Sequence, residues 1–246
     1  VLAALENGAR SALTVIAACA TAGIIVGAVS ITGLGITFSR FVIDLAGGNL
    51  FFLLVLIGVA SIIMGMGMPT VSAYVILAVL GAPALIQLGV NEVAAHMFVF
   101  YFGVMSGLTP PVAITAYTTA GIAGSNPLMT SVYSMRIGMG GFFIPFIFAY
   151  NPILLMQGGT TIEMSIAIFS AFLSCILFAG ALEDYFFGRL GALKRIIMFV
   201  SALLLVVPGI LTDLIGLSIA ITILVWQKKY SNRLAHMEDK KLAKVR

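Results

Sequence analysis

Residues 65–70 read Gly-Met-Gly-Met-Pro-Thr and interrupt a long apolar run, with apolar residues at 50–64 before them and 71–88 after them. The two glycines free the backbone and Pro69 removes an amide hydrogen, so the chain should leave helical geometry here. At 1.5 Å per residue the shorter arm covers only about 22 Å, which is marginal for crossing a bilayer. We therefore predict a re-entrant hairpin over residues 49–88 with its tip inside the membrane.

A second interruption lies within residues 91–124, where residues 107–111 read Gly-Leu-Thr-Pro-Pro. An apolar helix should run over residues 91–106 and another over residues 112–124, because consecutive prolines cannot continue a helix. We predict a single membrane span in two halves. Non-helical backbone is tolerated inside a bilayer only where protein buries it or where it lines a polar cavity. Two breaks so close in sequence therefore indicate a functional site.

The composition places both breaks in a membrane protein. Of the 246 residues, 61% are hydrophobic and 9% are charged, and the mean hydropathy is +1.15, whereas about a quarter of the residues of a soluble domain are charged. Residues 11–39, 45–91 and 137–162 contain no charge, and each stretch reaches the roughly 20 residues that span a bilayer core. A water-soluble fold is excluded. The predicted fold class is an all-α polytopic membrane protein.

The basic residues indicate how the chain is oriented. The net charge is +4, and most of the basic residues lie in 189–195 and 228–246. This distribution is typical of the cytoplasmic flanks of membrane spans rather than of a nucleic-acid surface. We expect membrane lipid around the chain, no nucleic-acid partner and a cytoplasmic C-terminus.

The remaining segments follow from the same alternation of apolar and polar sequence. Residues 34–48 carry Arg40 and Asp44 among large apolar residues, which suits an amphipathic arm at the membrane interface, although a plain loop fits equally well. Arg136 should lie at the basic edge of its span or in a polar crevice. Also predicted are an interfacial approach over 1–10, a span over 11–33, a span over 127–150, a further span and a helical hairpin within 160–226 whose turn includes Pro208 and Asp213, and a cytoplasmic tail over 227–246.

The two breaks offer groups that bind ions. Carbonyls released from helices, together with serine and threonine hydroxyls, suit a hard cation, and the amino ends of half-helices direct a positive dipole toward an anion. Secondary transporters build their sites in this way. The alternative is that the glycines and prolines only kink closely packed helices. The predicted ion and substrate site comprises Gly65, Met66, Gly67, Pro69, Thr70, Ser106, Gly107, Thr109 and Pro110. Its sodium candidates are Gly65, Gly67, Thr70, Ser106 and Thr109, free carbonyls are also expected at Met66, Gly107 and Leu108, and Ser72 is a further hydroxyl.

The coupling ion is predicted from the scarcity of titratable groups. Glu92 is the only acidic residue in 45–162, and its place at a helix start is explained by capping or by an interfacial position. A proton relay normally needs an intramembrane acid or histidine, and His96 is the other candidate. A packed or interfacial role suits His96 better. Sodium held by neutral oxygens is therefore favoured, with a proton as the alternative coupling ion.

The sequence shows none of the enzyme motifs that would indicate catalysis in a membrane protein. The sequence contains no HExxH, no GxGD aspartate and no GxSxG nucleophile. Cys19 and Cys175 form no CxxC pair. We predict neither catalysis nor a cofactor. Re-entrant loops also build selectivity filters, so the alternative function is an ion channel or a structural membrane subunit assembled from an oligomer.

The sequence resembles the large membrane component of the tripartite ATP-independent periplasmic (TRAP) transporters, and in particular the fused permeases that join small and large subunits. The dense part of the resemblance covers 65–124 and is specific. The resemblance rests on the segments 65–74 (GMGMPTVSAY), 82–85 (APAL), 94–102 (AAHMFVFYF), 108–113 (LTPPVA), 120–124 (AGIAG), 150–152 (YNP) and 207–213 (VPGILTD).

This resemblance implies an elevator-type permease in the cytoplasmic (inner) membrane of a bacterium or archaeon. Such a permease receives an organic acid from a periplasmic substrate-binding protein and imports it with a downhill ion, generally sodium. By position, residues 65–70 would form the tip of the second re-entrant hairpin and residues 107–111 the break of the following span. Both would border the second cation site and the substrate.

The family pattern also implies two inverted repeats, each with its own hairpin and broken span. This sequence has one GxGxPT and one LTPP. We therefore expect residues 1–150 to be the C-terminal inverted repeat, and the N-terminal remainder of the permease to be a partner that supplies the other hairpin and cation site. Pairing of two copies is the less favoured alternative.

Overall fold

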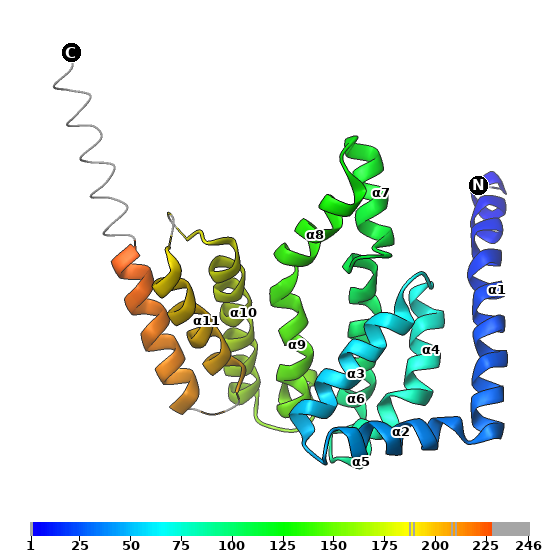
Figure 1. Cartoon of the computed structure of the whole chain (residues 1–246), viewed down its shortest axis with the longest axis horizontal. Helices are drawn as coiled ribbons and strands as arrows, with labels where there is room; N and C mark the ends of the chain where they lie inside the picture. Colours follow the sequence, from blue (N-terminus) through cyan, green and yellow to red (C-terminus); the bar gives the residue numbers. More distant parts are fainter. Residues whose placement is uncertain (1, 187, 189, 208, 210, 228–246) are drawn as a thin grey trace. The chain divides into compact units, whose positions relative to one another are not determined.

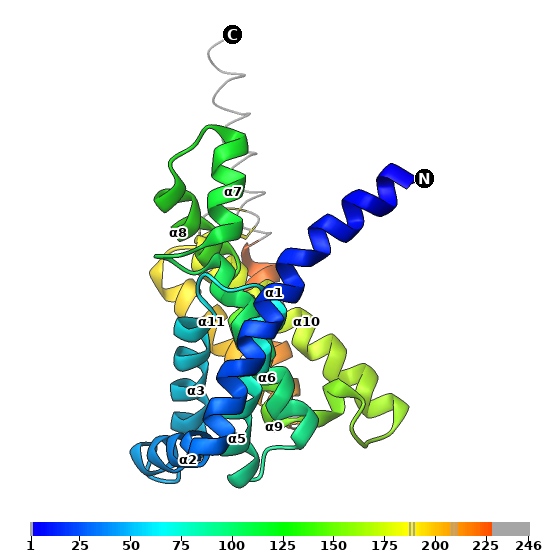
Figure 2. The same cartoon turned by 90° about the vertical axis from the view of Figure 1, so that its right-hand side faces the viewer.

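The computed structural model describes residues 2–186, 188, 190–207, 209 and 211–227, and most of these residues are helical. The all-helical class predicted from the sequence is confirmed. Figures 1 and 2 show the helices in chain order. The helices are α1 (Leu2–Thr32), α2 (Leu34–Leu45), α3 (Leu50–Gly65), α4 (Thr70–Leu80), α5 (Ala82–Gln87), α6 (Glu92–Met105), α7 (Ile114–Ala123), α8 (Pro127–Ile137), α9 (Met139–Tyr150), α10 (Thr161–Glu183), α11 (Ala192–Val206) and a last helix Leu211–Gln227, with 3₁₀ turns at Ser106–Leu108 and Pro152–Leu155.

Three helices in the described residues are long and apolar enough to cross a membrane: Ala3–Thr32, Thr70–Gln87 and Thr161–Glu183. The chain is thus a multi-pass membrane protein. It forms two compact units, Val1–Met135 and Arg136–Arg246, which are described separately below.

The first unit is centred on α3, α4 and α6. Asn49 begins α3 by accepting hydrogen bonds from the amides of Phe51 and Phe52 at 2.9 and 3.3 Å, which satisfies two of the four amides that every helix start leaves unpaired. Figure 1 shows α3 and α4 running in opposite directions on either side of a short loop. The predicted hairpin is therefore present as a helical hairpin, while its position in a membrane stays a prediction.

The core of this unit depends on small residues that let helices approach closely. A Cβ placed on Gly58 of α3 would lie 3.2 Å from the ring of Phe102 in α6. A Cβ placed on Gly103 of α6 would lie 3.1 Å from Leu77 of α4. Between membrane helices there is little hydrophobic driving force, so such close packing is the main source of association. α6 therefore packs tightly against both arms of the hairpin.

The N-terminal helices differ in part from the prediction. α1 is continuous from Leu2 to Thr32, so residues 3–10 continue the helix instead of forming a separate approach. The helix ends at Gly33, which has φ of +68°, a conformation that favours glycine. Residues 34–45 are helical rather than a loop: Ser39 and Val42 are buried in α2 while Phe41 is exposed, as an amphipathic helix requires. Its place at the membrane interface stays a prediction.

The second unit is a helical bundle. The ring of Phe178 in α10 stacks on Phe143 of α9, with centroids 3.9 Å apart and 9° between the planes. Two hydroxyls join helices within the bundle: Ser174 donates to the carbonyl of Ala202 at 2.9 Å, and Ser201 donates to that of Gly216 at 2.7 Å. Such interhelical hydrogen bonds help hold membrane bundles together.

Two segments differ from the spans drawn on the sequence. The predicted span 127–150 is two helices, α8 and α9, bent by 43° at Gly138, where glycine weakens the helix. In the last hairpin, Asp213 lies in the first turn of the helix Leu211–Gln227 instead of in the connecting turn. Pro208 and the tail residues 228–246 lie outside the described residues.

Candidate functional site

The hairpin tip leaves helical geometry at the predicted residues. α3 ends at Gly65, and Met66 is extended with ψ of 127°. Gly67 has φ of +78°, and Pro69, with φ of −59°, precedes the first residue of α4. Glycine tolerates the left-handed conformation that this turn requires, and proline presets the dihedral at the start of a helix. The sequence Gly-Met-Gly-Met-Pro thus encodes the tip locally.

The tip meets the second break at very short range. A Cβ placed on Gly65 would lie 2.8 Å from the Ser106 hydroxyl oxygen and 3.0 Å from the carbonyl oxygen of Gly103. A Cβ on Gly67 would lie 3.7 Å from a methyl group of Val112, beyond the prolines. The structure therefore brings two of the predicted site residues, Gly65 and Ser106, into direct contact.

The second break is a structured segment. After α6 the chain makes a 3₁₀ turn at Ser106–Leu108, becomes extended at Thr109, and contains a cis peptide bond between Pro110 and Pro111 before α7 begins at Ile114. The observed non-helical stretch is slightly longer than the predicted 107–111, since a proline pair disrupts the residues on both sides.

Hydroxyl groups from α7 hold this break in place. Thr115 donates to the carbonyl oxygen of Gly107 at 2.5 Å, and the Tyr117 hydroxyl donates to the carbonyl of Pro111. Both bonds connect the first turn of α7 back to the chain that precedes it. Neither residue was predicted from the sequence. A side chain that bonds a carbonyl several residues earlier, across a break, produces no recognisable sequence pattern.

The backbone oxygens available at the two breaks are mostly those predicted. Within the described part of the chain, the carbonyls of Met66, Gly67 and Leu108 accept no hydrogen bond. Two other predicted carbonyls are already engaged: that of Gly65 accepts from the Met68 amide at 3.3 Å, and that of Gly107 accepts from Thr115. A carbonyl has two lone pairs, so both retain capacity for a ligand.

The candidate hydroxyls fall into a buried set and an exposed one. Ser106 donates to the carbonyl of Gly103 at 2.6 Å and Thr109 to that of Met105 at 2.9 Å, and both side chains are buried. A hydroxyl that donates its hydrogen keeps its lone pairs for a cation. Thr70 and Gly67 are exposed. The five sodium candidates therefore do not form one enclosed ligand shell in this conformation.

The titratable residues near the breaks have ordinary roles. Asn91, not Glu92, caps α6, accepting from the amides of Val93 and Ala94 at 3.0 and 3.3 Å. His96 is half-buried, and its Nδ1 lies 3.2 Å from the Tyr74 hydroxyl. This pair connects α6 to α4 behind the tip, as the packed role predicted for His96 requires.

Comparison with protein families gives one result that decides the identity of the chain. Residues 1–162 match the family described as tripartite ATP-independent periplasmic transporter, DctM component. The chain belongs to this family. The match covers both breaks and the hairpin, and it implies a membrane transporter component that works with other TRAP components. No curated protein and no solved structure matches the chain.

The DctM match ends at the beginning of α10, so most of the second unit lies beyond it. At the end of α10 two arginines bind the last carbonyls of the helix. Arg136 contacts the Glu183 carboxylate at 3.2 Å and donates to the carbonyl of Leu182 at 2.9 Å. The carbonyl groups at a helix C-terminus carry partial negative charge. Arg136 is exposed and interacts with this helix end, while its predicted place at a membrane edge or in a polar crevice stays a prediction.

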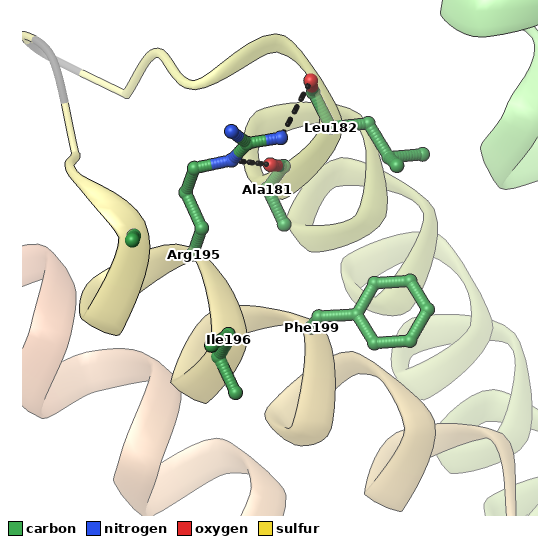
Figure 3. A pocket seen from close by; sticks show the side chains of 6 residues that line it. Ala181, Leu182, Arg195, Ile196 and Phe199 are labelled. Carbon is green, nitrogen blue, oxygen red and sulfur yellow. Dashed lines mark hydrogen bonds between the residues drawn. The ribbon is translucent and has the colours of Figure 1, made fainter.

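Arg195 lines a cavity of about 290 Å³ at the same end of α10, as Figure 3 shows. Its guanidinium donates to the carbonyls of Ala181 and Leu182 at 2.8 and 3.4 Å, and lies 3.9 Å from Asp184. The remaining lining is largely apolar and includes Phe199. The guanidinium of Arg195 therefore caps the C-terminal end of α10.

Proposed function

We propose that this DctM-family chain belongs to the permease of a TRAP secondary transporter, which imports an organic acid delivered by a periplasmic binding protein and is driven by a sodium gradient. The observation that supports this proposal is the direct approach of the two helix breaks, at Gly65 and Ser106. In transporters, discontinuous helices of this kind build ion and substrate sites.

The case for sodium rests on neutral oxygens. Free carbonyls at Met66, Gly67 and Leu108 lie in the same two breaks as the Ser106 and Thr109 hydroxyls. Hard cations accept carbonyl and hydroxyl ligands. α3, α4 and α7 contain no carboxylate, and α6 contains only the exposed Glu92 at its first residue. A cation held here needs no ionised side chain and no proton transfer.

The case for an anionic substrate rests on two helix starts. α4 begins at Thr70, directly after the tip, and α7 begins at Ile114, three residues after Pro111. Neither start has a side-chain cap, so their amide groups remain available to a carboxylate. The opposite charges of sodium and carboxylate would stabilise each other in a site of low dielectric constant.

The orientation follows from the charges of the second unit. Arg136, Lys194 and Arg195 lie at the end of the bundle where α10 finishes, while Glu163 and Asp213 belong to the helix starts at the other end. Positive charge marks the cytoplasmic side. We therefore place the end of α10 in the cytoplasm of a bacterial or archaeal cell, and the start of α10 on the periplasmic side, where the binding protein docks.

This proposal is tested by uptake into proteoliposomes that contain the chain together with its binding protein and any N-terminal remainder of the permease. Labelled succinate, pyruvate and glutamate serve as probes of three carboxylate classes. We expect accumulation of at least one probe only with an inward sodium gradient, and loss of accumulation in Thr109→Val. Uptake that ignores both the sodium and the proton gradient would contradict the mechanism, and ion conductance without the binding protein would indicate a channel.

Orientation is tested separately with single cysteines introduced in a background without Cys19 and Cys175. Gln157 and Tyr185 are exposed and lie at opposite ends of α10. We expect a membrane-impermeant thiol reagent to label Gln157→Cys in intact cells and Tyr185→Cys only after permeabilisation. The reverse pattern would invert the proposed topology.

A further inference from the structure

The carboxylates at the two ends of the second unit differ in how their charge is balanced. At the end of α10, Glu183 and Asp184 lie 3.2 and 3.9 Å from arginine side chains. Glu163 and Asp213 form no ion pair with any described residue. Glu163 is the third residue of α10 and Glu183 the last, so at 1.5 Å per residue about 30 Å of helix separates them. The arginines therefore balance one end of the unit, and the described residues leave two negative charges at the other.

Both unbalanced carboxylates line the same cavity, which has a volume of about 340 Å³. Glu163 is exposed, whereas Ser170, two turns further along the same face of α10, is 7% exposed. The Ser170 hydroxyl donates to the carboxylate of the half-buried Asp213. One carboxylate thus lies at the open end of the cavity and the other at its buried end.

A second cavity, of about 190 Å³, adjoins the first and shares Ser170 and Asp213 with it. Its other lining residues are all apolar: Ile166, Phe169, Leu173, Leu205, Leu214 and Leu217. Apolar walls with a few convergent polar groups are typical of sites for small organic molecules. A carboxylate removed from water is costly without a partner, so a bound cation would stabilise this end of the bundle.

The lining favours an organic cation over a metal ion. Within the described residues no group of three or more histidine, cysteine, aspartate or glutamate side chains could hold a metal. Hard metal ions also need several oxygen ligands, which the apolar second cavity does not offer. An alkyl group, in contrast, gains by leaving water for such walls. The cavities therefore suit a ligand that combines one positive charge with a short hydrocarbon chain.

We propose that these two adjoining cavities bind an alkylammonium ion. The ammonium group lies against the Asp213 carboxylate, and the alkyl chain lies along the apolar walls of the second cavity. Glu163 attracts the cation to the open end. The site contains no residue of the two helix breaks, so it goes beyond the proposed function. Two sources carry this group: a soluble amine, and the headgroup of phosphatidylethanolamine in the surrounding membrane.

The test is thermal unfolding of the purified full chain in detergent, titrated with hexylammonium chloride at neutral pH and constant ionic strength. Asp213→Asn removes the charge and keeps an acceptor for Ser170. Glu163→Gln keeps the capping box with Thr160, because glutamine serves there as well as glutamate. The matched control is Asp44→Asn, which removes an exposed carboxylate from the first unit.

We expect the apparent Kd for hexylammonium to rise about tenfold or more in Asp213→Asn and about two- to threefold in Glu163→Gln. It should stay unchanged in the control. Propylammonium should bind about fourfold more weakly for each methylene that it lacks. An unchanged Kd in Asp213→Asn would overturn the proposal, and so would equal stabilisation by hexan-1-ol, which has the same chain without the charge.

The two sources are separated by lipid competition. If phosphatidylethanolamine added to the micelles displaces hexylammonium and phosphatidylcholine does not, the natural ligand is the lipid headgroup. If hexylammonium binds as expected and neither lipid displaces it, the ligand is a soluble amine. Either result supports the ammonium site. Equal displacement by both lipids would overturn it, because the site would then recognise only hydrocarbon chains.

Discussion

The hairpin tip and the break after α6 both interrupt apolar helices, yet the chain holds them in different ways. In the second break, hydroxyls of Ser106, Thr109 and Thr115 all donate to nearby carbonyls. At the tip, no side chain from Met66 to Thr70 makes a hydrogen bond within the described residues. One break is braced by its own side chains, and the other relies on glycine dihedrals and on packing. The tip is thus the part whose stability should depend most on a ligand.

The largest effect is expected from a substitution at the contact between the two breaks. A Cβ on Gly65 would meet backbone atoms of Gly103, which cannot rotate away. We expect Gly65→Ala to lower the free energy of unfolding by about 1 to 3 kcal/mol and to abolish uptake. Circular dichroism during thermal unfolding in detergent measures the first effect. Gly121→Ala is the matched control because that glycine faces open space in α7; equal stability of the two variants would show that the breaks do not meet as described.

The next largest loss of stability is expected from substitutions at Gly67, whose backbone is left-handed. Gly67 has φ of +78° and has room for a Cβ, with the nearest atom of Val112 at 3.7 Å. Gly67→Ala should therefore cost about 1 to 2 kcal/mol through backbone strain alone. Gly67→Asn should cost less, since asparagine tolerates the left-handed region. Thermal unfolding of both variants checks this order, and an alanine variant as stable as the asparagine variant would argue against the strained turn.

The hydrogen bond from Thr115 that holds the second break should contribute less to the free energy of unfolding. Thr115→Val removes the hydroxyl that holds the Gly107 carbonyl, and we expect a loss of about 1 kcal/mol. Thr118→Val is its control, since that hydroxyl bonds only within its own helix, to Ile114. Equal losses in the two variants would mean that the bond across the break adds nothing. The measurement is again the unfolding transition in detergent.

The smallest effect concerns the histidine behind the tip. If both breaks work with neutral oxygens, replacing His96 should leave the pH profile of uptake unchanged. His96→Gln loses the hydrogen bond and the edge-to-face ring contact with Tyr74, so stability should fall by about 1 kcal/mol. Uptake measured from pH 5.5 to 8.5 tests this expectation. A shifted pH profile of uptake would favour proton coupling. It would also mean that His96 takes part in transport together with the two breaks.

The positions of the breaks could be predicted from the sequence because their causes are local. Glycine and proline act on their own dihedrals, so Gly67 and Pro110 mark non-helical backbone wherever the helices pack. The start of α6 is also local in origin, although Glu92 rather than Asn91 was considered for the cap from the sequence. The all-helical class follows equally directly from composition.

The remaining features depend on partners distant in sequence. The sequence near Gly65 does not indicate that this glycine contacts Ser106. Ser61 resembles any small residue of an apolar helix, and only the structure shows that its buried hydroxyl has no hydrogen-bond partner among the described residues. The ion pair between Arg136 of α8 and Glu183 of α10 joins residues that are 47 positions apart. The bend at Gly138 was missed because an isolated glycine is tolerated in many straight helices.

The fit of Gly65 against Gly103 also limits how the hairpin can move. A Cβ at this position would already lie 3.0 Å from the carbonyl oxygen of Gly103, so an axial shift that brought a larger residue here would produce a clash. If transport displaces the tip across the membrane, we expect the broken helix to move with it. Oxygens contributed by both breaks would then keep their spacing throughout the stroke, and a bound ion would be carried across without being released on the way.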